Sequence, residues 1–305
     1  HCTTEANLQN TDGTGWIPLN LSSIYGGSPI PYLPIDPSNE ASLLRYYQYI
    51  PGGSYGLASL LESEKYTQSR SKNDGGFDPE RFEIGSDLSL WDDIYGLVGC
   101  WDFDEENESI AYDNSGNNNH AIISESTYVT DTPSDSGLAM KFNGLGDKID
   151  LNYSPVFNIR EGITLSSWIK RLTDFNQAAD VHVLSRPPSW YFYDSYNSGN
   201  IRGEILIDGV RMGSRLVNLP FDGNWYLITY TYDSDSQLSK IYKNGELVSS
   251  IQLSGLPNYL INSSTEDFVS IGRTSSGRSM IFDDLRIYDR ALSDSEISAI
   301  YNAGK

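Results

Sequence analysis

Residues 225–248 read WYLITYTYDSDSQLSKIYKNGELV, and this stretch decides the fold. Apolar and polar side chains alternate in WYLITYTY (225–232) and again in LSKIYK (238–243). A period of two predicts strands with one buried face. Asn244 and Gly245 follow the second run, and both residue types tolerate positive φ, so a type I′ hairpin turn is expected there. The stretch therefore predicts antiparallel β-structure.

Similar runs recur at 163–170 (ITLSSWIK) and 279–289 (SMIFDDLRIYD). The tail of the chain differs, because Ser293 and Glu296 form a capping box and Gly304 ends the apolar stripe behind it, which predicts one short C-terminal helix. The residues expected in a sandwich core are Leu165, Trp168, Leu227, Ile241 and Ile287.

Composition excludes several classes of protein. The 305 residues carry a formal net charge of −20, which opposes binding to nucleic acid or to an anionic membrane. No run reaches the roughly 18 apolar residues that a bilayer span needs. The first residue is His1 rather than Met, so a processed or trimmed chain is expected.

The chain has two cysteines, Cys2 and Cys100, and no CxxC pair that would indicate a zinc ribbon. In an oxidising compartment we expect one disulfide between them, and two free thiols are the alternative.

Residues 1–95 are rich in Gly and Pro, and the run at 44–63 predicts two strands around a Pro-Gly-Gly turn. The motifs LPIDPSN (33–39), GSYGLASLLES (53–63) and NDGG followed by RFEIGSDL (73–88) together resemble the globular head of type IV pilin-like (prepilin-type) proteins. The resemblance covers roughly residues 14–91. The family's cleavage site and long apolar stalk helix are missing from this sequence.

The pilin resemblance implies a non-catalytic filament subunit. Related pseudopilin heads hold a structural calcium, and Asp74, Asp78 and Asp87 are the matching oxygen donors here. Solvated turn residues are the alternative interpretation of these aspartates.

From Gly96 onward an ordered set of motifs resembles a concanavalin A-like, laminin G-like jellyroll. The motifs are GLVGCWDFDE (96–105), YDNSGNNNHA (112–121), LAMKFNGLGDKIDL (138–151), ITLSSWIK, DGNWYLITYTYD (222–233), KIYKNGELV (240–248), SIG (270–272) and FDDLRIYDRALSDSEISAIYN (282–302). The resemblance implies two antiparallel sheets packed face to face, with the first and last strands as neighbours. We therefore expect a mainly β protein, with a small α+β pilin-like head at 1–95 and an antiparallel β-sandwich jellyroll at 96–305.

The jellyroll resemblance also implies a structural calcium site next to the first and last strands. By match to the family, Asp113 and Asp283 supply carboxylates, Asn118 and His120 contribute mainly backbone oxygens, and Asp284 is the alternate carboxylate. Calcium accepts such mixed oxygen donors. A polar turn without metal, in which Asn residues occupy positive-φ positions, is the alternative.

Some jellyroll relatives hydrolyse polysaccharides with paired carboxylates. Asp102, Asp104 and Glu106 only partly match the glucanase pattern, while Glu204 and Asp208 share a strand face without a third acid. A retaining pair also needs a defined carboxyl separation that sequence spacing does not secure. We expect no enzymatic activity, and a secreted polysaccharide hydrolase is the alternative.

The segment 189–200 (SWYFYDSYNSGN) concentrates aromatic and polar residues. Trp190, Tyr191, Tyr193 and Tyr196 are candidates for a glycan-binding edge, and a strand with buried aromatics is the alternative.

These observations lead to one functional expectation. The protein is expected to be an extracellular subunit of a bacterial type IV pilus or pseudopilus that displays a laminin G-like domain for adhesion. Expected partners are other pilin subunits and a glycan or cell-surface ligand.

Overall fold

The structure is a computed structural model of the chain, and the chain divides into two units, His1–Tyr95 and Gly96–Lys305. In the first unit it describes residues 9–11, 32–34, 48–51, 55–60 and 81–85. In the second it describes residues 96–105, 109–135, 137–143, 146–152, 154–172, 180–187, 189–195, 198–207, 210–212, 217–256, 268–273 and 279–304.

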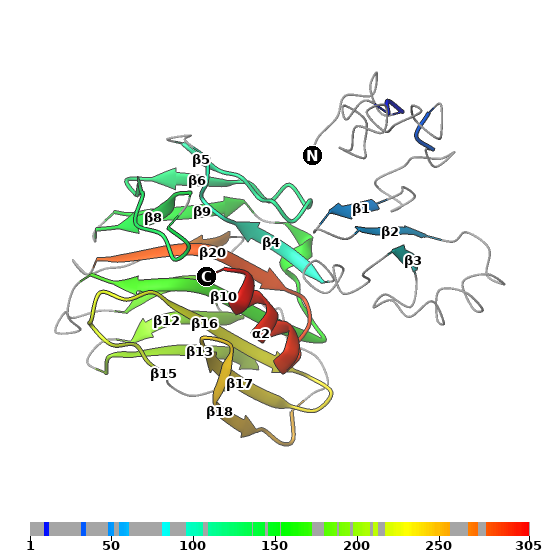
Figure 1. The fold of residues 1–305 in the computed structure, drawn as a ribbon. Coiled ribbons are helices and arrows are strands. Elements are labelled where there is room, and N and C mark those ends of the chain that lie inside the picture. Colours follow the sequence, from blue (N-terminus) through cyan, green and yellow to red (C-terminus); the bar gives the residue numbers. More distant parts are fainter. Residues whose placement is uncertain are drawn as a thin grey trace. The chain divides into compact units, whose positions relative to one another are not determined.

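The first unit contains a three-stranded antiparallel sheet in the order β1-β2-β3 (Figure 1). Strands β1 (Gln48–Pro51) and β2 (Tyr55–Leu60) confirm the hairpin predicted around the Pro-Gly-Gly turn, and β3 is Arg81–Gly85. The described part of this unit contains no helix, so the α+β pilin-like fold predicted for it is not shown. Cys2 and the three predicted calcium ligands of the head lie outside the described residues.

The second unit is a mainly β sandwich of two antiparallel sheets, and the strand orders follow the predicted jellyroll class. The eight-stranded sheet has the order β18-β17-β16-β10-β20-β8-β7, and β4 pairs with β20 beside β8. The first strand of this unit therefore lies next to its last strand, as predicted. Its strands are β4 (Leu97–Trp101), β7 (Thr127–Val129), β8 (Ala139–Phe142), β10 (Gly162–Arg171), β16 (Tyr226–Asp233), β17 (Leu238–Lys243), β18 (Glu246–Gln252) and β20 (Met280–Tyr288).

The nine-stranded sheet has the order β14-β13-β12-β11-β19-β9-β6-β5, and β15 pairs with β13. Its strands are β5 (Ile110–Ala111), β6 (Ala121–Ser124), β9 (Lys148–Asn152), β11 (Val181–Arg186), β12 (Trp190–Ser195), β13 (Asn200–Ile207), β14 (Val210–Met212), β15 (Val217–Asn218) and β19 (Phe268–Ile271). A short 3-10 helix, η6 (Pro155–Phe157), follows β9.

The hairpin that opened the sequence analysis forms as predicted. β17 and β18 pair antiparallel, and Asn244 and Gly245 both have positive φ, at 54° and 79°. The Asn244 side chain also accepts a hydrogen bond from the amide of Leu227, which holds the turn against β16.

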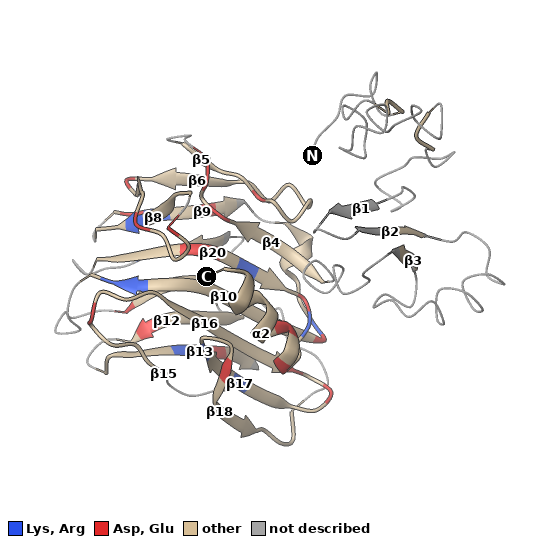
Figure 2. Ribbon diagram, in the orientation of Figure 1, with Lys and Arg blue, Asp and Glu red and all other residues tan. Residues whose placement is uncertain are grey.

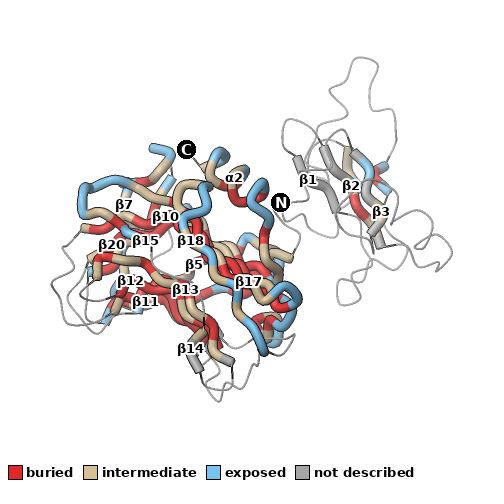
Figure 3. Tube along the Cα trace, turned by 90° about the horizontal axis from the view of Figure 1, so that it is seen from below, coloured by how far each residue is buried: buried red, intermediate tan, exposed pale blue. Residues whose placement is uncertain are grey.

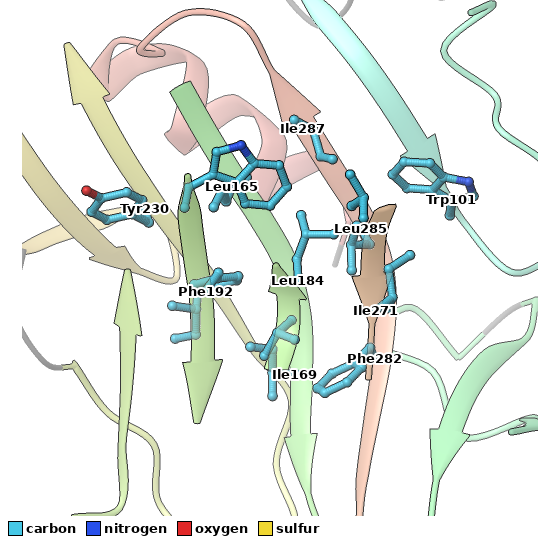
Figure 4. Packing of buried hydrophobic residues seen from close by; sticks show 14 of the residues in the cluster. Trp101, Leu165, Ile169, Leu184, Phe192, Tyr230, Ile271, Phe282, Leu285 and Ile287 are labelled. Atoms are coloured by element: carbon cyan, nitrogen blue, oxygen red, sulfur yellow. The ribbon is translucent and has the colours of Figure 1, made fainter. Parts of the chain in front are cut away.

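The main core lies between the two sheets. It contains Trp101, Leu165, Phe192, Tyr230 and Phe282, which come from strands of both sheets and pack against one another (Figure 4). Figure 3 shows that the buried residues follow these strands, while most exposed residues lie in turns and on the C-terminal helix. Alternation along each strand therefore places one face of each sheet in this core.

A second, smaller core lies on the other face of the eight-stranded sheet, under helix α2 (Asp294–Ala303). Ser293 and Glu296 form the predicted capping box, and Gly304 is the C-cap. Trp168 and Leu227 belong to this second core and not to the sandwich core, which corrects their predicted place. β10 is buried on both faces, so alternation alone did not show which face meets the other sheet. Among the helices of the described residues, none has the length and hydropathy that crossing a membrane requires.

One ion pair is fully buried and joins the two sheets. Arg171 at the end of β10 donates from Nε and Nη2 to the two carboxylate oxygens of Asp194 on β12, at 3.1 and 2.7 Å. Arg171 also donates to the carbonyl of Leu219, and the side chains of Arg171 and Asp194 are 1% and 0% exposed. Figure 2 shows a basic end on β10 and an acidic end on β12, whereas most of the length of the sandwich strands is uncharged.

We expect Asp194→Asn to lower the free energy of unfolding by about 3–5 kcal/mol, because it leaves the Arg171 charge buried without a counter-charge. Urea denaturation measures this difference. The matched control is Lys170→Ala, which removes the partly exposed Lys170–Asp131 pair and should cost about 1 kcal/mol or less. Equal losses in the two variants would contradict the assigned role of the buried pair.

Candidate functional site

The segment 112–121 is organised around the carboxylate of Asp113, which is 6% exposed. Its Oδ1 accepts hydrogen bonds from the backbone amides of Cys100 and Ser115, and its Oδ2 accepts one from the amide of Asn119, each at 2.9 Å. A carboxylate that accepts several amide N–H bonds is held firmly in place. Asp113 therefore ties β4 to the loop that follows β5.

The other polar residues of this loop hold the same strand. The side-chain Nδ2 of Asn119 donates to the carbonyl of Val98 at 2.9 Å, and the side-chain Nδ2 of Asn117 donates to the carbonyl of Leu97 at 2.9 Å. Asn118 has a φ of 57°, which is the positive-φ role that the alternative interpretation assigned to an Asn of this loop. His120 Nδ1 accepts from the amide of Asp113 at 3.0 Å.

Asp283 and Asp284 lie on β20 at a register shift opposite Ser166 and Trp168. Asp284 has a φ of 50°, and its carboxylate pairs with Arg286 at 3.2 Å. Asp283 is largely buried and accepts a hydrogen bond from the amide of Asp284 at 2.7 Å. Burial, and then the charge of Asp284, raises the pKa of Asp283 to about 8.

The predicted carboxylate ligands of calcium have protein partners in the structure. Both oxygens of Asp113 are engaged by amides, and the charges that most raise the pKa of Asp283 come from Asp284, Asp104 and Asp102. Within the described residues, no group of three or more His, Cys, Asp or Glu side chains is arranged to hold a metal ion. Calcium binding therefore stays a prediction, and no functional step below depends on it.

The acids considered for catalysis have structural partners. The Asn114 side chain donates to Asp102 at 2.7 Å, and the amide of Leu138 donates to Asp104 at 2.7 Å. Glu204 accepts from the Tyr193 hydroxyl at 3.0 Å and lies 3.7 Å from Arg202. Glu106 and Asp208 lie outside the described residues.

The predicted aromatic edge divides between the two faces of β12. Trp190 is 1% exposed and lies in the sandwich core, so it is not available to a ligand. Tyr191 and Tyr193 point to the opposite, outer face of the nine-stranded sheet, where the ring of His182 lies 5.6 and 5.9 Å from their ring centroids. Tyr196 lies outside the described residues.

The outer face around these tyrosines also carries polar residues that sequence reasoning missed. His182 Nδ1 lies 3.0 Å from the Ser185 hydroxyl, and Arg202 pairs with Tyr193 across β12 and β13. On β9, Lys148 forms an ion pair with Asp150. The sequence shows charged residues two positions apart within strands, as in Lys148 with Asp150, which predicts that each pair lies on one face of its strand. The strand order was needed to show that these strands present those residues on the same face of the sheet.

Cys100 is half-buried, and burial raises the pKa of its thiol to about 12. The predicted disulfide stays a prediction, because Cys2 lies outside the described residues.

A family model described as the concanavalin A-like lectin/glucanases superfamily (Laminin_G_3) matches residues 143–298, slightly more than half of the chain. The chain belongs to this superfamily. No curated protein matches the sequence.

Solved structures give the same fold for the jellyroll unit. The receptor binding domain of a botulinum neurotoxin C/D mosaic serotype is similar with a TM-score of 0.55 and 19% identity, over 68% of this chain and 51% of that chain. The binding domain of Paraclostridial Mosquitocidal Protein 1 gives 0.55 and 19%, over 68% and 52%. A structure of botulinum neurotoxin type C, whose cell entry is described as dependent upon interaction with two ganglioside molecules, gives 0.55 and 13%, over 69% and 51%. This chain thus spans about half the length of these structures, and at these identities the likeness shows the fold alone.

We expect Asp113→Ala to lower the free energy of unfolding by about 3 kcal/mol, because three amides lose a charged acceptor. Asp113→Asn should cost less, because the Asn carbonyl oxygen still accepts while its amide does not. Chemical denaturation measures both variants. The control is Asp135→Asn, which changes an exposed aspartate outside this loop. If Asp113→Ala lowers the free energy of unfolding no more than the control does, the three hydrogen bonds to the Asp113 carboxylate contribute little to stability.

We expect the free energy of unfolding to fall as pH rises from about 5 to 9, in part through Asp283. Between its ordinary pKa of 3.8 and the folded value of about 8, Asp283 holds a proton only in the folded state, so raising the pH removes that stabilisation. Asp283→Asn should flatten this dependence and be more stable than the parent chain above pH 8. Thermal melting across pH measures the difference, and parallel curves would contradict it.

The calcium prediction has its own test in the same assay. If the carboxylates of β20 bind calcium, adding the ion to chelator-treated protein at pH 9 raises the melting temperature of the parent chain and not of Asp283→Asn. No rise in the parent chain would contradict the prediction.

Proposed function

We propose that this protein is a non-catalytic adhesin whose β-sandwich binds glycans. The observation that carries the proposal is the outer face of the nine-stranded sheet, where Tyr191 and Tyr193 lie beside His182 and the Glu204 carboxylate. Sugars present CH faces that stack on aromatic rings and hydroxyls that hydrogen-bond to carboxylates and imidazoles. Tyr191 is only half-buried and supplies the ring, while Tyr193 is mostly buried and orients Glu204.

The fold is compatible with this use. Solved structures with the same fold include a toxin receptor binding domain, and cell entry of neurotoxin type C is described as dependent upon interaction with two ganglioside molecules, which carry glycans. The likeness fits a binding role and is no evidence against catalysis. It does not identify the ligand, because the low identity carries over only the fold.

The first unit is proposed to present the sandwich on an extracellular filament. The support is its motif resemblance to type IV pilin heads. Labelling native surface filaments with an antibody against the second unit tests this role, and filaments without label would contradict it.

We expect the full-length chain to bind members of a glycan array and to release no reducing sugar from the polysaccharides that it binds. Tyr191→Ala should weaken binding at least tenfold, about 1.4 kcal/mol, with an unchanged melting temperature. The matched control is Tyr112→Ala, which removes an exposed tyrosine of the loop after β5. Turnover of a bound polysaccharide would favour the rival function of a secreted hydrolase.

A further inference from the structure

The β5 end of the nine-stranded sheet carries an exposed apolar surface. β5 ends the strand order of this sheet, and Ile110 of β5 lies opposite Ile122 of β6 (Figure 1). Their chain neighbours Ala111 and Ala121 are buried in the sandwich core, so the two isoleucines point to the outer face. Ile122 is 53% exposed, so an aliphatic side chain lies in solvent at this end of the sheet.

A tyrosine and a histidine extend this surface along the same two segments. Tyr112 follows β5 and is 39% exposed, and the exposed ring of His120, just before β6, contacts it edge to face, with 5.1 Å between the ring centroids. His120 Nδ1 accepts a hydrogen bond from the amide of Asp113 at 3.0 Å, which holds the imidazole in place. We call Ile110, Tyr112, His120 and Ile122 the edge patch. Contiguous exposed side chains of this kind, rimmed by polar residues, mark interaction sites.

Carboxylates flank the edge patch on its β5 side. Glu105 accepts a hydrogen bond from the backbone amide of Tyr112, which places this carboxylate beside the patch. Burial raises the pKa of Glu105, and the charges of Asp102 and Asp104 raise it further, so these three acids lie near one another. This side of the edge patch is therefore negatively charged.

The β9 side of the edge patch is also acidic but partly neutralised. Asp150 of β9 lies opposite Ile122 in register and forms an ion pair with Lys148. The rim of the patch therefore holds one lysine and four carboxylates, which are those of Asp102, Asp104, Glu105 and Asp150. The whole chain also has a net charge of −20. A negative potential of this kind attracts basic partners and repels acidic ones.

Charge and polarity decide between the possible occupants of the edge patch. A second copy of this chain would bring the same acidic rim against itself, because a symmetric contact uses the same surface twice. A glycan would find no hydrogen-bonding group on the side chains of Ile110 and Ile122. A protein segment with apolar and basic side chains matches both the apolar surface and its acidic rim.

We propose that the edge patch binds a segment of a partner protein that presents apolar side chains next to lysine or arginine. The apolar side chains pack on Ile122 and Tyr112, and the cations pair with the carboxylates of Glu105 and Asp150. This contact does not rest on the proposed glycan binding, because Tyr191 lies on β12, four strands away from β6 in the sheet order.

Fluorescence anisotropy of labelled peptides, measured with the full-length chain, tests the proposal. The probe is a short peptide in which leucine and lysine alternate. One comparison peptide replaces each lysine by glutamate, and the other replaces each leucine by serine. We expect the leucine–lysine peptide to bind and each comparison peptide to bind at least tenfold more weakly. Raising the salt concentration from about 50 to about 300 mM should weaken binding of the leucine–lysine peptide at least threefold, because salt screens exposed charges.

Variants separate docking at the edge patch from a general attraction of basic peptides to an acidic chain. Ile122→Ser should weaken binding of the leucine–lysine peptide at least tenfold with an unchanged melting temperature. The matched control is Leu247→Ser, since Leu247 is 47% exposed on edge strand β18 of the other sheet. Tyr191→Ala should bind this peptide like the parent chain, so a failure of glycan binding leaves this result unaffected.

The proposal is overturned if the leucine–lysine peptide does not bind, if either comparison peptide binds as tightly, or if Ile122→Ser binds like the parent chain. Sedimentation velocity tests the other occupant. A dimer of the parent chain that Ile122→Ser dissociates would also overturn the proposal, because the edge patch would then contact a second copy.

Discussion

The buried pair of Arg171 and Asp194 is the constraint on which the rest of the sandwich depends. Arg171 extends from the end of β10, crosses the core and meets Asp194 on β12 of the opposite sheet. Two charges in an apolar interior are tolerated only when both are paired and hydrogen-bonded, so their meeting fixes the sheets in one alignment. The third contact of Arg171, to the carbonyl of Leu219, also holds the chain directly after β15.

The same pair sets which side chains reach a ligand. Because Asp194 points inward, Trp190 and Phe192 on the same side of β12 enter the core, and Tyr191 and Tyr193 face outward. Their neighbours on β11 and β13 then bring a histidine, an arginine and a glutamate to the same face. The side chains that β12 presents on the candidate ligand surface thus follow from the buried ion pair and from the packing of Trp190 and Phe192 in the core.

Near β4, acidic and amide side chains form hydrogen bonds that stabilise the fold. The Asp113 carboxylate satisfies three backbone amides, and the asparagines around it satisfy the carbonyls of Leu97 and Val98. Buried backbone groups need such partners, and a loop rich in Asn and Asp supplies them where the strand ladder does not. Burial, and then the charges of Asp284, Asp104 and Asp102, raise the pKa of Asp283 at this end of the sandwich.

The sequence by itself determined the local structure of the second unit. Alternation predicted β10, β16, β17 and β20, Asn244-Gly245 predicted the turn, and Ser293 with Glu296 predicted the helix start. These features follow from interactions over a few residues. The neighbouring first and last strands came from family resemblance, and the pilin-like fold expected of the first unit is not shown.

Only the tertiary structure decided which face of each strand packs in the sandwich core, which packs under α2 and which faces outward. β10 is buried on both faces, so its period could not assign Trp168 to the core under α2 or Arg171 to the sandwich core. Local pattern also did not show that amides from two different segments engage both oxygens of Asp113. The nine-stranded sheet brings residues as far apart in sequence as Ile122 and Ser270 next to the same residue, Asp150, because strand order, which local interactions do not encode, sets neighbours across a sheet.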